Sequence, residues 1–354
     1  MAKVNRDFLE PDVAVAIARQ ELALFDANDT NSLARYLPSL EVDDIEYEIE
    51  VSGEDGNITA ANWRMFNGNT TSEKWGEGQK SRGRLMPLSR NYTLDEETRL
   101  RMRNDSKNAI RLESERLVRR AVRAIALEVN HQRANAISNA AVDIHGSGGL
   151  RQRVEFGRDA AFDTVAPILF SDPTADPLEQ IETWTEQYEE KNGFRPETVL
   201  MSNDVRRIIS SHPKVVLNAT RDANAERASA SELARLFGEY NLPEILPLPT
   251  SKVKKDNLET GETEYRSLFD KDSLLFLPRG GNAIDPQSSI FGRTMWGRTL
   301  SADTEDFGLG GGDLAGVVAA VIEEGWPSHL EIIADAIAMP VVFNPNFSLK
   351  AKVV

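Results

Sequence analysis

Residues 41–51 alternate between apolar and acidic side chains. The apolar positions are Ile45, Tyr47, Ile49 and Val51. A period of two predicts a strand with one face against protein and the other in water. Glycines at 53 and 56 mark a turn after it, and residues 58–66 are predicted to return as a second strand.

Segments with a helical period lie on both sides of this predicted hairpin. Residues 11–25 form an amphipathic helix, with Arg19 and Glu21 opposite its apolar face. That face contains Val13, Ile17 and Leu24. From residue 95 to 139 there is neither Pro nor Gly, and Thr93 and Glu96 have the spacing of a capping box. This pattern predicts one long helix of about 67 Å.

Residues 67–92 between these elements show no clear period. The segment is polar, basic and rich in Gly, yet it contains large apolar side chains at Trp75, Leu85, Met86 and Leu88. Two interpretations are open: a surface loop, or an arm that becomes ordered against a neighbouring chain. Aromatic residues and Met are enriched at interfaces, which favours the arm.

The second half of the chain reads as short helices and strands with strong end signals. Asp176, Pro177 and Glu179 predict a helix start, and Asn192-Gly193 predicts its end. Further helices are predicted after Ser202 and after the capping box of Ser229 and Glu232. Strands are predicted at 197–201, 244–248, 265–268 and 273–277, with a charged hairpin tip at 252–264.

The composition is that of an ordinary folded protein, but its charge is distributed unevenly. Apolar residues make up 40% and charged residues 27% of the 354 residues, and the net charge is −15. Residues 1–60 are strongly acidic, whereas residues 61–133 are basic. An acidic protein is not expected to be a dedicated nucleic-acid binder. The longest apolar run, 314–322, is too short to span a membrane, and no targeting signal is visible.

The basic residues of the predicted long helix continue along one face through Arg116, Arg119, Arg120 and Arg123. Such a face is often only solvated, but the acidic strand offers a partner through Glu46, Glu48 and Glu50. An ion-pair interface and a solvated face are therefore both open, with contact to DNA as a weaker third option. A coiled coil is disfavoured because the apolar stripe does not keep strict heptads.

No catalytic motif stands out. The chain has no Cys, no P-loop, no HExxH and no GxSxG, and its four His are dispersed. No metal and no cofactor is therefore expected, and the protein is predicted not to be an enzyme. The loop around Ser147 (His145-Gly-Ser-Gly-Gly149) faintly resembles an esterase oxyanion loop, but without a nucleophile elbow it is interpreted as a hinge.

The order of these parts resembles that of a known family. A terminal arm, a β-hairpin with a long basic loop and a long helix are followed by PILFSDPTADPLEQIETWTEQYEEKNGFRPETVLMSNDVRRIISSHPKV (167–215) and ADAIAMPVVFNPN (334–346). This order and the block at 175–205 are similar to the lambda-like group of tailed-bacteriophage major capsid proteins. The resemblance implies an α+β fold of the Hong Kong 97 type.

The resemblance also implies a division of the chain and a function. The parts are an N-terminal arm (1–51), an extended hairpin loop (52–93), a spine helix with the peripheral domain (94–155), an axial domain (156–325) and a return to the peripheral domain (326–354). The implied function is self-assembly as hexamers and pentamers into an icosahedral capsid, built in the host cytoplasm around phage double-stranded DNA. DNA is enclosed without sequence-specific binding, and no membrane is involved.

Several partners and contact residues follow from the resemblance as expectations. Because the first helix begins near residue 11, a separate scaffolding protein is expected, along with a portal and a decoration protein. Lys74 and Lys80 lie in the loop, which by itself does not predict a covalent crosslink between subunits. The residues predicted at subunit interfaces are Trp75, Lys74, Lys80, Met86, Glu46, Glu48, Glu50, Arg116, Arg119, Arg120 and Arg123. The competing functions are an encapsulin-like nanocompartment shell and, third, a hydrolase using the Ser147 loop.

Overall fold

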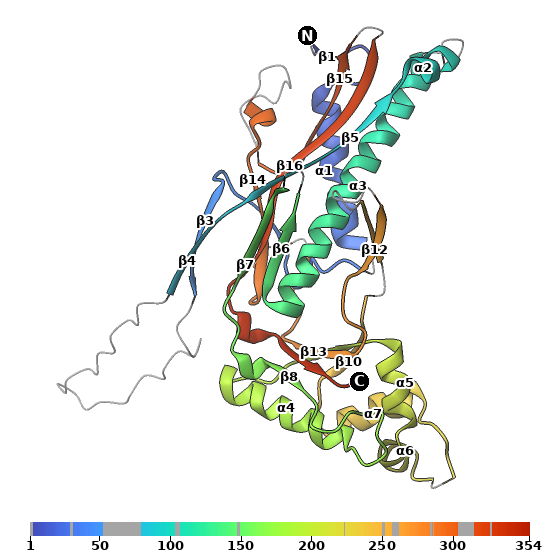
Figure 1. Ribbon diagram of the computed structural model, residues 1–354, viewed down its shortest axis with the longest axis vertical. Helices are drawn as coiled ribbons and strands as arrows, with labels where there is room; N and C mark the ends of the chain where they lie inside the picture. The colour runs from blue at the N-terminus through green and yellow to red at the C-terminus, as the bar shows by residue number, and fades with distance from the viewer. Residues whose placement is uncertain are drawn as a thin grey trace, which may run out of the picture.

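The fold was established from a computed structural model. It describes residues 3–28, 31–51, 79–102, 107–146, 149–222, 224–249, 252–256, 262–283, 285, 287–303, 315–325 and 328–354. The molecule is elongated, with a six-stranded sheet and long helices at one end and a five-stranded sheet with short helices at the other (Figure 1). We call these two parts the upper lobe and the lower lobe.

Strand β16 (His329–Val342) organises the upper sheet. Its first half pairs with β15 (Val318–Glu324) and its second half with β14 (Gly292–Gly297), while β5 (Met86–Leu94) runs along its opposite edge. All three pairings are antiparallel. Short strands β1 (Lys3–Val4) and β2 (Ser39–Glu41) complete the sheet. Buried and partly buried residues alternate along most of β16, so one face of the sheet meets the core.

Helices α1 (Pro11–Asn28) and α3 (Lys107–Asn139) cover that face, and α2 (Glu96–Met102) precedes α3 (Figure 1). The apolar stripe predicted on the long helix is confirmed. Its buried members are Val118, Val122, Ile125, Val129 and Ile137. The single helix predicted from 95 to 139 corresponds to the two described helices α2 and α3. Residues 103–106 between them lie outside the described part of the chain.

Two details predicted for these helices are wrong. The N-terminal cap of α2 is Asp95, whose carboxylate accepts a hydrogen bond from the Thr98 backbone N–H at 2.8 Å. Thr93, the predicted cap, belongs to β5 and pairs there with Glu331 of β16. On α1, Val13 and Leu24 are exposed while Glu21 is buried. The core contacts of α1 are made mainly by small residues such as Ala14 and Ala18, which allow α3 to approach closely.

The lower lobe has a sheet of strand order β10-β9-β13-β17-β8. These strands are β8 (Asp163–Val165), β9 (Thr198–Met201), β10 (Glu244–Pro247), β13 (Ser273–Leu277) and β17 (Leu349–Lys352). The helices are α4 (Pro177–Asn192), α5 (Asn203–Ser211), α6 (Pro213–Thr220) and α7 (Ala230–Glu239). Single 3-10 turns occur at Ala160–Phe162, Leu300–Asp303 and Pro345–Phe347.

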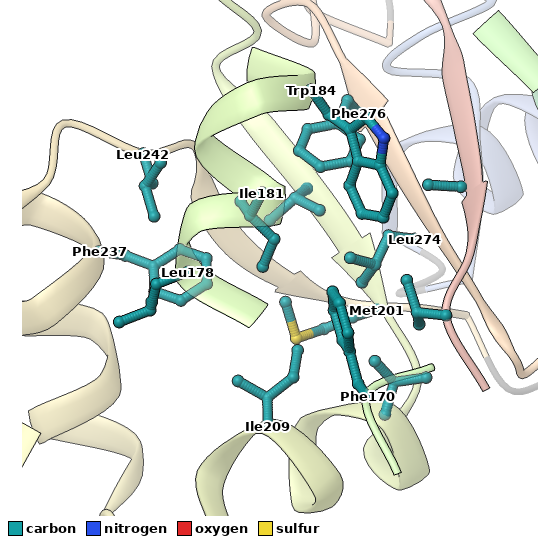
Figure 2. Packing of buried hydrophobic residues seen from close by; sticks show 14 of the residues in the cluster. Phe170, Leu178, Ile181, Trp184, Met201, Ile209, Phe237, Leu242, Leu274 and Phe276 are labelled. Atoms are coloured by element: carbon teal, nitrogen blue, oxygen red, sulfur yellow. The ribbon is translucent and has the colours of Figure 1, made fainter. Parts of the chain in front are cut away.

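The end signals predicted for these helices are confirmed. Asp176 and Ser202 cap α4 and α5, and Ser229 with Glu232 forms both halves of a capping box at α7. Figure 2 shows the core they enclose, where Trp184 of α4 meets Phe276 of β13 edge to face with ring centroids 6.1 Å apart. The four residues of β9 and the five of β13 are all buried, as expected for central strands.

The chain passes between the two lobes several times. Strands β14 and β15 pair with β16 in the upper sheet, whereas β17, which follows β16 in the chain, pairs with β13 and β8 in the lower sheet. Sheet neighbours are set by pairing across long sequence separations. The predicted division of the chain into domains stays a prediction.

Among the described residues, three further pairs of strands form two-stranded hairpins. They are β3–β4 (Glu46–Val51 with Gln79–Arg84), β6–β7 (Ala141–His145 with Arg151–Glu155) and β11–β12 (Lys252–Asp256 with Thr263–Ser267). The predicted hinge at 145–149 falls between the paired strands β6 and β7, where His145 lies opposite Arg151, and its residues 147 and 148 are outside the described part.

Candidate assembly interface

The β3–β4 hairpin leaves the side of the upper lobe as a separate arm (Figure 1). Its register places acidic positions of β3 opposite basic positions of β4: Glu46 with Arg84, Glu48 with Arg82 and Glu50 with Lys80. Among the side chains of this hairpin that the structure describes, Arg82 and Glu48 form an exposed ion pair with a distance of 2.9 Å. The acidic strand therefore has its basic partner within the same hairpin.

A buried tyrosine anchors the root of this arm. Tyr47 is 5% exposed and packs in the same cluster as Leu85, while its hydroxyl is buried without a hydrogen-bond partner among the described residues. Burial raises the pKa of Tyr47 to about 12. Gly83 lies opposite Tyr47 in the register, and a Cβ at Gly83 would come within 2.6 Å of Tyr47 Cε1 and overlap the hydroxyl oxygen. Only glycine leaves room for the ring to cross β4.

The second half of the predicted loop is strand, which corrects the interpretation of 67–92 as a segment without regular structure. Strands β4 and β5 occupy residues 79–84 and 86–94. Met86 begins β5, pairs with Ala338 of β16 and is partly buried. One face of β5 is covered: Leu88, Tyr92 and Leu94 pack against the upper core, while the odd-numbered residues are exposed. This strand therefore has a period of two, which the sequence interpretation missed. Lys74, Trp75 and the predicted returning strand 58–66 lie outside the described residues.

The predicted basic face of the long helix is present on α3, but each arginine has its own environment. Arg116 forms an ion pair with Glu113, one turn away on the same helix. Arg123 and Arg119 both approach Glu21 of α1, at 2.7 and 3.4 Å. Glu21, which α1 buries against α3, is thus a partner of this face within the subunit, and the sequence pattern did not indicate it.

Arg120 differs from these three. Its guanidinium lies 5.2 Å from the ring centroid of Tyr92 on β5, and the guanidinium of Arg90 lies 5.6 Å from the same centroid. Neither arginine has an ion pair or hydrogen bond with a described residue. Both are exposed, so their donor groups are directed to solvent or to a partner.

A buried ion pair fixes the position of α1 against α3 and the sheet. Arg133 of α3 contacts both carboxylate oxygens of Asp26, at 2.6 and 3.2 Å, and donates to Thr294 Oγ1 at 2.8 Å. Ser39 Oγ accepts a hydrogen bond from Arg133 and donates one to Asp26. Four elements thus meet at one guanidinium, and no sequence motif indicated it.

The described residues do not assemble a catalytic constellation. Ser147 of the hydrolase alternative lies outside the described residues. A cavity of about 410 Å³ beside the junction of the lobes is lined by Glu155, Arg158 and Asp163, among others, and Arg158 bonds Ser348 and Asp163 there. Within the described part of the chain, no three His, Asp or Glu residues come together as metal ligands, and no helix is long and apolar enough to cross a membrane.

Comparison with known proteins relates this architecture to others. A model of the phage major capsid protein E family matches residues 45–353. Among solved structures, a prophage protein of E. coli CFT073 described as a capsid protein superposes with a TM-score of 0.63 at 14% identity, covering 100% of both chains. A phage-related protein of Bordetella bronchiseptica RB50 superposes with a TM-score of 0.58 at 14% identity, covering 99% of this chain and 98% of the other. No curated protein sequence matches the chain.

Proposed function

The chain belongs to the phage major capsid protein E family, and we propose from this premise that the β3–β4 arm joins one subunit to the next in the shell. The family assignment makes the protein a structural component of an icosahedral phage capsid with the Hong Kong 97-type fold. It self-assembles, and its place in the virion is the capsid. The observation that carries the function is the family match over most of the chain.

The form of the subunit supports the proposed role of the arm. A two-stranded hairpin is at best marginally stable in water when nothing covers it. The arm contacts the upper lobe at its root, through Tyr47 and Leu85, while Glu46, Glu48, Arg82 and Arg84 are exposed. A neighbouring subunit lying across the arm would cover these side chains, which a single subunit leaves exposed to water.

The finer composition of the particle is part of the same proposal. Hexamers and pentamers of this chain form the shell, with a scaffolding protein and a portal directing assembly and a decoration protein binding outside. Assembly takes place in the host cytoplasm around double-stranded DNA. The family is one of structural proteins, which favours a role without catalysis over the hydrolase alternative.

Purified protein tests the function directly. Size-exclusion chromatography with light scattering, followed by negative-stain microscopy, is expected to show closed shells or capsomers. Shells filled with nucleic acid in infected or induced cells agree with a capsid, whereas shells loaded with one cargo enzyme point to a nanocompartment. A stable monomer at all concentrations, alone and with co-expressed phage structural proteins, contradicts the proposal.

The arm is tested by Trp75→Ala, with Tyr265→Ala as the control for loss of an exposed aromatic. Tyr265 is 67% exposed on β12, far from the arm in the chain. An aromatic anchor at an interface often contributes about 2 kcal/mol or more. We expect Trp75→Ala to leave the subunit folded and to lower the heat and denaturant resistance of the shell. Equal resistance of both variant shells and the parent shell would show that this loop is not an interface arm.

A further inference from the structure

The exposed face of α3 carries positive charge above recessed negative charge. We define the arginine strip as Arg90, Arg116, Arg119, Arg120 and Arg123. Where the strip forms ion pairs, the guanidinium is the exposed partner: side-chain exposure is 64% for Arg116 and 69% for Arg123, against 21% for Glu113 and 9% for Glu21. A molecule approaching from solvent therefore meets cations first.

The strip is also richer in cations than in carboxylates. Five guanidiniums share only Glu113 and Glu21 among the described residues, because Arg90 and Arg120 stack on Tyr92 without an acidic partner. The stacked arginines keep their N–H groups available for the fork-shaped contacts that guanidinium makes with phosphate. This local excess stands out in a chain of net charge −15.

We propose that the arginine strip binds the phosphodiester backbone of nucleic acid, without reading its sequence. The inference rests on the proposed function, which places DNA inside the shell. Arg116 and Arg123 are seven residues apart, about 10 Å along the helix, a distance that covers about three phosphates of one strand. Backbone contacts from arginine position DNA but carry no base information.

The contact is expected to be weak for one subunit. About three phosphate contacts give a slope of about −2.7 in a plot of log K against log salt, so the affinity falls by about 40-fold between about 50 and 200 mM salt. The acidic remainder of the chain opposes binding further. Many identical strips in one shell add their effects, since linked weak contacts act together.

The test measures binding of a fluorescent duplex of about 20 random base pairs to the soluble full-length subunit across a salt series. Arg116→Gln with Arg120→Gln is compared with Arg206→Gln and Arg207→Gln on α5, which removes the same charge from the lower lobe. The strip variant is expected to flatten the salt slope by about 0.9 for each phosphate that it no longer neutralises. The α5 variant is expected to keep the slope of the parent.

A second variant controls for the possibility that the first one loses affinity because it is misfolded. Arg90→Gln breaks no ion pair or hydrogen bond with a described residue, so it is expected to flatten the slope by about 0.9 without changing the circular dichroism spectrum. Unchanged slopes in both strip variants, or equal weakening by the α5 variant, would overturn the proposal. Strip variants that bind DNA like the parent but no longer form shells, where the parent does, would identify an acidic segment of another chain as the occupant of the strip and would also overturn the proposal.

Shell formation by the parent is scored separately by negative-stain microscopy. A parent that binds DNA through the strip but never forms a shell refutes the proposed function and leaves this inference standing. A parent that forms shells whose subunits do not bind DNA refutes the inference alone.

Discussion

Replacing Asp26 by alanine tests the buried ion pair that joins α1 to the rest of the upper lobe. The Arg133 side chain is only 1% exposed, and Asp26 supplies both oxygens that neutralise it. After the substitution, the guanidinium keeps only the hydroxyls of Thr294 and Ser39 as partners. Removing one partner of a buried pair leaves an uncompensated charge away from water, which costs about 3–5 kcal/mol.

This destabilisation should be visible as a lower melting temperature of the protein. Dividing about 3–5 kcal/mol by an unfolding entropy of about 2.1 cal/mol/K per residue over the 354 residues gives an expected decrease of roughly 4–7 °C. The transition of the whole protein is expected to shift in calorimetry, because one apolar cluster contains residues of both lobes, among them Ile137 of α3 and Leu275 of β13. Asp204→Ala on α5 is the matched control, because Asp204 is exposed and pairs with Arg207 at the surface.

A double substitution separates the cost of leaving a buried charge unpaired from the cost of losing the ion pair itself. Asp26→Ala with Arg133→Met removes both charges and leaves an apolar side chain of similar length, so it should destabilise the protein by less than the sum of the single changes. A decrease below about 1 kcal/mol for Asp26→Ala alone would refute the reasoning, because it would mean that water reaches Arg133.

Two further predictions concern Gly83 in the β3–β4 arm and His131 on α3. Gly83→Val is expected to displace the Tyr47 ring, because the new Cβ would lie within 2.6 Å of its Cε1, and so to slow shell formation. Normal assembly kinetics of this variant would contradict the prediction. Burial lowers the pKa of His131; the nearby Lys255 and Arg266 lower it further, and Glu128 raises it in part. His131 therefore takes up a proton at a higher pH in the unfolded chain than in the folded chain. Stability should therefore fall as the pH drops below the usual His value of about 6.5, and His131→Gln should reduce this dependence in urea unfolding measured from about pH 7.5 to 5.

Local signals in the sequence were sufficient for the lower lobe. Asp176, Ser202 and Ser229 cap the helices they were predicted to cap, because a side-chain oxygen and a backbone N–H three residues later interact within one turn. Strands β9 and β13 were predicted for a similar reason, since a short fully apolar run between turn signals is typical of a central strand. The family resemblance itself depended on the same region.

The upper lobe and the interface were decided by tertiary structure. Within one subunit, register places Glu48 beside Arg82, and packing places Glu21 beneath Arg119 and Arg123. Contact between the acidic strand and the basic helix of neighbouring subunits stays a prediction. Substituting Arg119 and Arg120 by Glu would place a carboxylate beside the buried Glu21 and disturb the subunit, so this change would not test assembly alone.

The sequence by itself determined where the capped helices of the lower lobe begin, which short apolar runs form its central strands and which family the chain resembles, because these depend on residues close together in the chain. Only the tertiary structure decided which charges meet, which strands share a sheet and why Asp26 and Arg133 can be buried. Those outcomes depend on atoms far apart in sequence, and an ion pair or a sheet edge has no local pattern that specifies its partner.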